Sequence, residues 1–290
     1  MKSDVESKRQ AEQLPGEDEQ IVERVKERYA KFAEGGAAVG CCSPTGDKPQ
    51  KPTEGEVAES IGYRSDDLQC VPEGANLGLG CGAPIQHLQL QPGETVLDLG
   101  SGGGLDAFLA AKCVGENGRV IGVDMTPEMI EKARGNAKRA GLDQVEFRYG
   151  RLEELPVEDN SVDAVTSNCV INLVPQKSRV FGEIVRVLRP GGRVVISDIV
   201  LDGELPEAVR SDLMAYVGCV AGAMQRESYF SKIEEAGLVG VEILQDSDYL
   251  GAVENVLPEE VVGLLNRTGV RLADLRGRVR SVTWKARVAV

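Results

Sequence analysis

Cys169 is a residue whose type and position could do chemistry. It comes shortly after Val162-Asp163-Ala164-Val165, a run that predicts a short buried strand. In α/β folds, the residues that follow such strands lie at the edge where ligands are bound. A cysteine there offers a soft thiolate, which suits a thiophilic metalloid better than it suits a hydroxyl group. Cys169 is therefore a candidate ligand.

Two more cysteines, Cys81 and Cys219, have neighbours that suggest a ligand role. Cys81 stands between Gly80 and Gly82, and Cys219 follows Gly218. Glycine beside a thiol leaves room for a ligand and lets the backbone aim the sulfur. Both could converge with Cys169 on one site. The alternative for each is a small buried hydrophobe, which is the common role of a free cysteine.

The chain has seven cysteines and one histidine, His87. We expect reduced thiols, because the charged N-terminus lacks the apolar region of a secretory signal. No cysteine pair has CxxC spacing, so a structural zinc site is not expected. Cys113, in an Ala-rich helical run, is predicted to be buried core filler, and Cys70 is predicted to be a bystander.

Charge and hydropathy exclude some classes of protein. The 290 residues carry 33 basic and 46 acidic side chains, a formal charge of −13, and the pI is about 4.8. Phosphates would repel such a chain, so neither nucleic acid nor an anionic membrane surface is an expected partner. No stretch approaches the roughly 18 apolar residues that span a bilayer. We expect an acidic cytoplasmic protein.

The middle of the chain alternates between strand and helix patterns. Short apolar strands alternating with helices predict βαβ units, and hence an α/β fold whose mostly parallel sheet has helices on both faces. The predicted strands are Thr95–Leu99, Arg119–Val123, Val145–Arg148, Val162–Val165, Arg193–Ile199 and one near Val241–Leu244. The predicted helices are Leu105–Val114, Pro127–Ala140, Lys177–Leu188, Pro206–Val217 and Ser228–Ala236.

The ends of the chain are less regular. Ile21–Phe32 has apolar residues at helical spacing, and Ser65 is a plausible N-cap for a short helix through Gln69. Residues 35–60, with Cys41 and Cys42 near their start, predict a long loop. Residues 250–290 predict a short helix at Pro258–Leu265 and a basic, β-branched tail.

A glycine-rich turn follows the first predicted strand of the alternating region. Gly100, Gly102 and Gly104 are spaced G-x-G-x-G, whereas the dinucleotide fingerprint is G-x-G-x-x-G. Asp124 ends the second strand, where a carboxylate can accept hydrogen bonds from ribose hydroxyls. The turn resembles motif I of class I S-adenosylmethionine-dependent methyltransferases. Arg189-Pro190-Gly191-Gly192-Arg193 resembles a later element of the same fold.

The methyltransferase resemblance implies a Rossmann-like fold and a cofactor site. Leu152 and Glu153 would lie at the adenine; the alternative for Glu153 is a solvated loop acid. The implied S-adenosylmethionine residues are Asp98, Gly100, Ser101, Gly102, Gly104, Asp124, Met125, Leu152, Glu153 and Asn168.

Longer strings resemble the arsenite methyltransferase family. They begin at Val71–Gly82 and continue through the glycine turn and Ile121–Met129. Ser167-Asn168-Cys169-Val170-Ile171-Asn172-Leu173 is the most specific string, and Tyr216–Ala223 is the last. The resemblance covers about residues 70–245. We expect a methyltransferase domain at 76–248, preceded by an N-terminal helical and loop segment at 1–75 that carries Cys41 and Cys42 and followed by a small C-terminal extension at 249–290.

The family resemblance also implies a chemistry for the thiols. Cys81, Cys169 and Cys219 would bind trivalent arsenic, and Cys41 or Cys42 would take part in a redox step. The arsenic lone pair would attack the sulfonium methyl in line, and glutathione or thioredoxin would return the electrons that methylation removes.

Two other functions remain open from the residues. One is a small-molecule O- or C-methyltransferase with structural cysteines, which would be indifferent to thiol blocking. The other is a metalloid-binding sensor or sequestering protein. The acidity of the chain argues against a DNA-binding sensor, and the intact glycine turn argues against lost cofactor binding.

Overall fold

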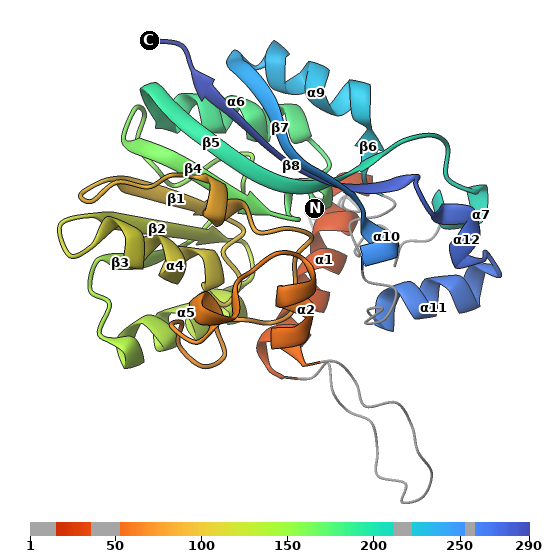
Figure 1. The fold of residues 1–290 in the computed structure, drawn as a ribbon, viewed down its shortest axis with the longest axis horizontal. Helices are drawn as coiled ribbons and strands as arrows, with labels where there is room; N and C mark the ends of the chain where they lie inside the picture. Colours follow the sequence, from red (N-terminus) through yellow and green to blue (C-terminus); the bar gives the residue numbers. More distant parts are fainter. Residues whose placement is uncertain (1–15, 36–52, 211–221, 253–258) are drawn as a thin grey trace, which may run out of the picture.

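A computed structural model describes residues 16–35, 53–210, 222–252 and 259–290 of the chain. A central sheet runs through the molecule with helices packed on both faces, and this confirms the predicted fold class (Figure 1). The strands are β1 Thr95–Leu99, β2 Arg119–Asp124, β3 Val145–Tyr149, β4 Val162–Asn168, β5 Leu188–Leu201, β6 Met224–Gln225, β7 Leu238–Asp248 and β8 Val279–Val288.

The described helices agree closely with the periodicity of the sequence. In the α/β region they are α4 Leu105–Val114, α5 Pro127–Ala140, α6 Lys177–Val187, α7 Glu207–Arg210 and α9 Arg226–Glu235. Before it come α1 Glu17–Ala33, α2 Glu54–Ser60, α3 Ser65–Leu68 and the 3₁₀ turn η2 Pro84–His87, and η3 Ile171–Leu173 follows β4. After it come α10 Tyr249–Ala252, α11 Glu259–Thr268 and α12 Leu272–Leu275. The predicted residues 211–217 lie outside the described part of the chain.

The strand order of the sheet is β3-β2-β1-β4-β5-β8-β7. Strands β1 to β5 are parallel, and β8 is antiparallel to both of its neighbours, β5 and β7. The segment 249–290, which the sequence set apart as a small extension, thus supplies an inner strand of the sheet. Burial on both sides explains why its residues Val282 and Trp284 are fully enclosed.

Alternate residues of each strand feed two hydrophobic layers, as the two-residue repeat of a strand requires. Val96 of β1 and Val120 of β2 face the layer that contains α4 and α5. Leu97 and Ile121, their neighbours along the chain, face the layer that contains α6 and α9. These layers hold the carboxyl ends of the parallel strands in fixed register, and the candidate site lies there.

The prediction of a loop at 35–60 is wrong for its last residues, because residues 54–60 form the helix α2. Thr53 Oγ1 accepts a hydrogen bond from the Glu56 amide at 3.2 Å, and Glu56 Oε2 accepts one from the Thr53 amide at 2.8 Å. This reciprocal capping box satisfies amides that the first helical turn leaves without partners. The T-x-x-E spacing of the sequence carries that signal.

The prediction that Cys113 is buried is also wrong, because its side chain is exposed. The buried stripe of α4 follows helical spacing through Ala107, Ala110, Ala111 and Val114. Cys113 falls outside this stripe. Cys70 is exposed as well, and it accepts a hydrogen bond from Lys112 Nζ at 3.3 Å.

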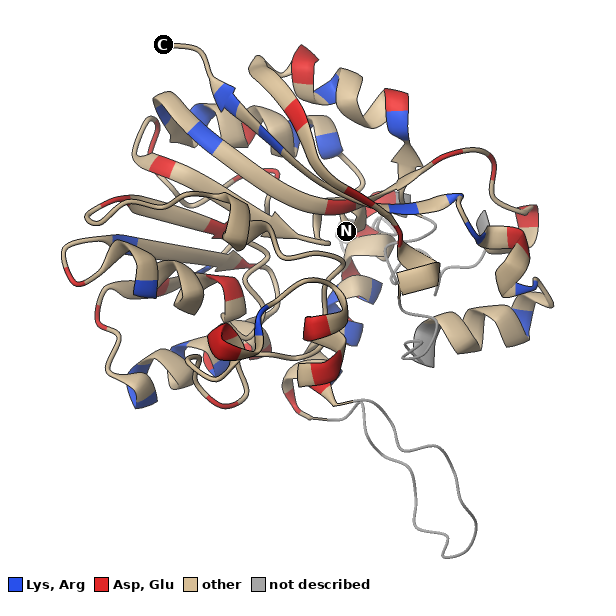
Figure 2. Cartoon of the chain, in the orientation of Figure 1, with Lys and Arg blue, Asp and Glu red and all other residues tan. Residues whose placement is uncertain are grey.

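Charged side chains cover the outside of this fold. Figure 2 shows Lys and Arg interspersed with Asp and Glu over the described helices and strands. Within the described residues, no helix combines the length and apolar character needed to cross a membrane.

Candidate active site

The candidate site lies at the carboxyl ends of β1, β4 and β5. Strand β1 pairs with β2 on one side and with β4 on the other, so the order of the chain reverses between β1 and β4. A crevice forms at such a switch point because the connections on its two sides run in opposite directions. The glycine turn follows β1, and Cys169 follows β4. The fold therefore brings the predicted cofactor turn and the predicted arsenic ligand Cys169 to the same edge of the sheet.

The glycine turn has the open backbone that a close ligand requires. Gly100, Gly102 and Gly104 have φ values of 67°, 51° and 100°, which favour glycine. A Cβ added at Gly102 would meet no atom within 4 Å, so the turn is open on that side. Asp124 supports the turn: its Oδ2 accepts from the Gly102 amide at 3.0 Å, and its Oδ1 accepts from the Thr126 amide at 2.8 Å.

Buried polar atoms beside the turn fit a polar, cationic ligand. Asp98 Oδ2 and Ser101 Oγ are buried, and the described residues give them no hydrogen-bond partner. Burial raises the pKa of Asp98 well above its usual range, and the nearby charge of Asp106 raises it further. A bound cation would relieve this cost, because an opposite charge favours the ionised carboxylate. The residues present thus fit S-adenosylmethionine, which carries a sulfonium and an ammonium group.

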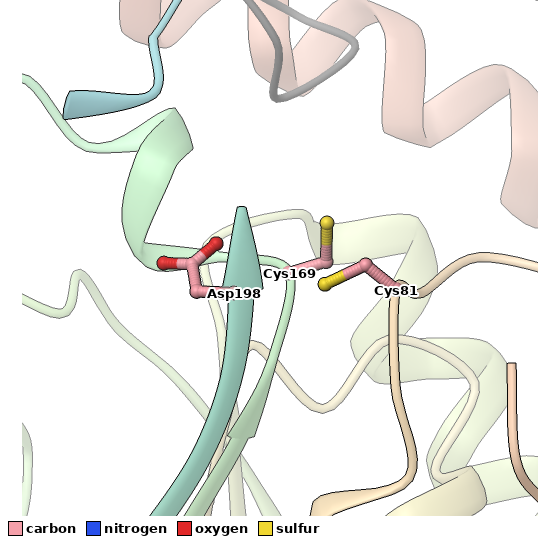
Figure 3. A group of neighbouring side chains, drawn as sticks. All are labelled: Cys81, Cys169 and Asp198. Atoms are coloured by element: carbon pink, nitrogen blue, oxygen red, sulfur yellow. The ribbon is translucent and has the colours of Figure 1, made fainter. Parts of the chain in front are cut away.

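Two of the predicted arsenic ligands meet in the structure. The sulfur atoms of Cys81 and Cys169 and a carboxylate oxygen of Asp198 all lie within 4.8 Å of one another. Figure 3 shows these three side chains. Cys81 is 3% exposed, and Cys169 is partly buried. The third predicted ligand, Cys219, and the predicted redox residues Cys41 and Cys42 lie outside the described residues.

Cys169 has an unusual backbone conformation. Its φ is 59°, in the left-handed region that a side chain with a Cβ rarely adopts. Its amide donates to the Ser197 carbonyl on β5 at 2.8 Å, which holds this conformation. Strained residues of this kind gather at functional sites. This turn comes directly after β4 and leaves the Cys169 sulfur within 4.8 Å of the Cys81 sulfur.

Asn168 joins the segments that carry these two thiols. Its Oδ1 accepts from the Cys81 amide at 3.0 Å, and its Nδ2 donates to the Gly82 carbonyl at 2.6 Å and to Tyr63 Oη at 2.8 Å. Tyr63 in turn donates to Asp106 at 2.8 Å. Sequence reasoning assigned Asn168 to the cofactor. In the structure its amide spans the loop of Cys81 and the end of β4, next to Cys169.

Sequence reasoning missed Asp198, the third member of the cluster. Its Oδ1 accepts from Asn172 Nδ2 at 2.8 Å and from the Ile199 amide at 2.9 Å, and its Oδ2 accepts from Tyr229 Oη at 3.1 Å. Burial raises the pKa of Asp198 to about 7, although these hydrogen bonds and the charge of Lys177 favour the ionised form. A single acid in the apolar strand Arg193–Ile199 is the signal that could have revealed it.

The remaining predicted cofactor residues lie around the same edge. Met125 packs in the hydrophobic cluster that contains Cys81 and Cys169. Leu152 belongs to the core between the sheet and α6. Glu153 is 9% exposed and pairs with Arg151 at 2.9 Å, so it is not a solvated loop acid. Arg151 also binds Glu19 of α1 at 2.8 Å.

Comparison with known proteins gives the family of this fold and site. The methyltransferase domain family model matches residues 90–237. The chain belongs to this family. An arsenite methyltransferase of Halobacterium salinarum is 50% identical over 237 residues, which are 78% of this chain and 59% of that protein. The human arsenite methyltransferase is 39% identical over 155 residues, which are 50% of this chain and 40% of that protein.

A solved structure agrees with these relatives. CrArsM, an arsenic(III) S-adenosylmethionine methyltransferase from Chlamydomonas reinhardtii, is 31% identical, with a TM-score of 0.58 over 83% of this chain and 75% of that chain. Within the methyltransferase domain family, the chain therefore belongs among the arsenite methyltransferases. It spans about 59% of the length of the Halobacterium relative.

Proposed function

We propose that this protein methylates trivalent arsenic, with S-adenosylmethionine as the methyl donor. The observation that carries the proposal is the meeting of Cys81 and Cys169 beside the glycine turn, with sulfur atoms within 4.8 Å of each other. Vicinal thiols of this kind suit a soft metalloid. A donor site and a thiol site at one sheet edge bring the two reactants together.

The donor site is formed by residues of the first three strands and the turns that follow them. Gly102 leaves open space for the donor, Gly100 and Gly104 let the turn adopt positive φ, and Asp124 holds the turn and accepts from the ribose. Asp98 and Ser101 meet the polar groups of the methionine portion. Met125, Leu152 and Glu153 line the adenosine portion, in keeping with their position at the ends of β2 and β3.

The thiols prepare arsenic for attack. The thiols of Cys81, Cys169 and Cys219 replace the hydroxyls of arsenite; each thiol proton goes to a hydroxyl, which leaves as water, and arsenic keeps its lone pair. S-adenosylmethionine supplies a sulfonium methyl: its carbon–sulfur bond breaks with the electron pair going to sulfur, while the arsenic lone pair forms the new bond to carbon. No general base is needed. Holding two reactants at near-attack geometry contributes roughly 7–11 kcal/mol to catalysis.

Methylation leaves arsenic pentavalent and cationic, so two electrons must return before a second methyl group is added. In our proposal a thiolate of Cys41 or Cys42 attacks the Cys81 sulfur bound to arsenic. A disulfide forms, and the electron pair of the arsenic–sulfur bond returns to arsenic as its lone pair. A thiol reductant, glutathione or thioredoxin, then reduces the disulfide. Cys169 and Cys219 keep methylarsenic bound throughout, and the thiol chemistry calls for a reducing compartment such as the cytoplasm.

The test is incubation of the full chain with arsenite, S-adenosylmethionine and glutathione, followed by speciation of the arsenic products. Methylated arsenic is the expected result. If the protein binds S-adenosylmethionine but forms no methylated arsenic, the proposal is wrong, and an O- or C-methyltransferase with structural cysteines becomes the better interpretation.

A further inference from the structure

Asp198 places a carboxylate against the two thiols of the site. It lies on β5, is completely buried, and has an oxygen within 4.8 Å of both sulfur atoms (Figure 3). Burying an acid costs free energy, and acidic neighbours disfavour thiolates. Neither effect helps the fold or the resting thiols. A role toward the substrate that the two thiols bind would explain why an acid lies at this position.

The environment of Asp198 favours action through charge rather than coordination. Three donors already hold the carboxylate: Asn172 and the Ile199 amide on one oxygen, and Tyr229 on the other. Asn172 and Tyr229 are themselves completely buried, so the group is fixed in place. A carboxylate oxygen is also a harder ligand than the sulfur that arsenic prefers. In its ionised form, which a cationic neighbour favours, Asp198 is therefore a negative charge held in place beside the bound substrate.

We propose that Asp198 stabilises the positive charge that develops on arsenic during methyl transfer. This inference rests on the proposed arsenic methylation. As the carbon–sulfur bond breaks and the arsenic–carbon bond forms, the positive charge of the sulfonium moves to arsenic. Fixed charges aimed at the place where charge develops lower the barrier, because they do not reorganise during the reaction.

The strand order places Asp198 on the correct side for this role. The acids of the donor site, Asp98 and Asp124, lie on β1 and β2, where they favour positive charge on the donor. Cys169 follows β4, and Asp198 lies beyond it on β5. The Cys169 thiol thus lies between acids of β1 and β2 that stabilise the starting charge and an acid of β5 that stabilises the final charge. Asp198 favours the direction of transfer.

The test compares Asp198→Asn with the wild-type full chain. Asparagine has nearly the same shape, keeps an oxygen for Asn172 and Ile199, and can donate to the Tyr229 hydroxyl. Arsenite affinity is measured by titration of protein-bound arsenic, and methylation is measured as single-turnover rate, kcat and KM. We expect arsenite affinity and KM within about 2-fold of wild type. The expected loss of rate is about 100-fold, the typical effect of removing one preorganised electrostatic group.

Two further variants separate this role from a structural one. Asp202→Asn removes the same charge just after β5, where the acid is exposed and paired with Arg226 at 2.7 Å, and it should keep the wild-type rate. Tyr229→Phe removes one donor to Asp198 and should lower the rate severalfold without changing arsenite affinity. If the melting curve shows that Asp198→Asn does not fold, the methylation rate of Tyr229→Phe tests the role of Asp198 instead.

Three outcomes would overturn the inference. One is an unchanged rate in Asp198→Asn, or in Tyr229→Phe where that variant decides. Another is a parallel loss of arsenite binding, which would make Asp198 a ligand or a structural residue. The third is a wild-type protein that forms no methylated arsenic, which also overturns the proposed function. Wild-type turnover with a normal Asp198→Asn rate overturns this inference alone.

Discussion

The donor site and the thiol site share one edge of the sheet, yet they are built in different ways. The donor site comes from one continuous stretch, in which the glycine turn after β1 is supported by Asp124 at the end of β2. The described part of the thiol site comes from three separate places: the loop of Cys81, the end of β4 and the carboxyl-terminal part of β5. A local site can be altered without disturbing its neighbour, whereas an assembled site depends on contacts between distant segments.

The largest expected effect comes from removing a thiol. Cys169→Ser should abolish methylation of both inorganic and monomethylated arsenic, because a hydroxyl is a poor ligand for a soft metalloid. S-adenosylmethionine affinity, measured by calorimetry, should stay near wild type if the two sites are independent. Full activity in this variant or in Cys219→Ser would refute the assignment of the arsenic ligands.

A change in the glycine turn should weaken binding of the methyl donor and leave arsenite binding intact. Gly102→Ala adds a Cβ on the open side of the turn, so we expect S-adenosylmethionine affinity to fall about 10- to 100-fold while arsenite binding persists. The φ of 51° also strains alanine by roughly 1 kcal/mol. Gly141→Ala is the matched control, since Gly141, which ends α5, has a φ of 64° in the left-handed region and open space but lies outside the site. Equal donor affinity in both variants would contradict a donor site at this turn.

Asn168 tests whether the thiol site depends on distant contacts. Asn168→Ala removes the bonds to Cys81, Gly82 and Tyr63 and should weaken arsenite binding about 10-fold, the effect of losing one or two buried hydrogen bonds. Tyr63→Phe removes only the hydrogen bonds that Tyr63 makes with Asn168 and Asp106, so it should weaken arsenite binding less. A fall in donor affinity alone would instead support the cofactor role that the sequence predicted for Asn168.

The last expected effect is on stability rather than on ligand binding or rate. The pKa of Asp198 is about 7 in the fold and about 3.9 in an unfolded chain, so the folded state binds more protons between these values. Stability should therefore fall as pH rises from about 4 to 7, by at most about 4 kcal/mol. Melting temperatures at pH 5.5 and 8 measure it, and Asp198→Asn should reduce the dependence. Asp106, whose pKa is also about 7, contributes in the same direction. An equal dependence in both proteins would show that Asp198 does not titrate in this range.

Much of the fold was predictable, because its signals are local. Leu105–Val114 and Pro127–Ala140 match their predicted bounds, since apolar periodicity and the terminal Pro127 and Gly141 mark them. The capping box at Thr53 was equally local but was missed. The place of β8 between β5 and β7 had no local signal, because the sequence pattern of a strand does not determine which strands it pairs with.

The sequence by itself determined the class of the protein and the chemistry available to it. Strand–helix alternation, the glycine turn with its spaced acid, and the supply of thiols are properties of short segments. Only the tertiary structure decided that Cys81 lies against Cys169, that Asn168 joins their two segments, and that Asp198 faces both sulfur atoms. These contacts join residues up to 117 positions apart in the chain, from Cys81 to Asp198. Packing of the sheet fixes such distances, and no local pattern encodes them.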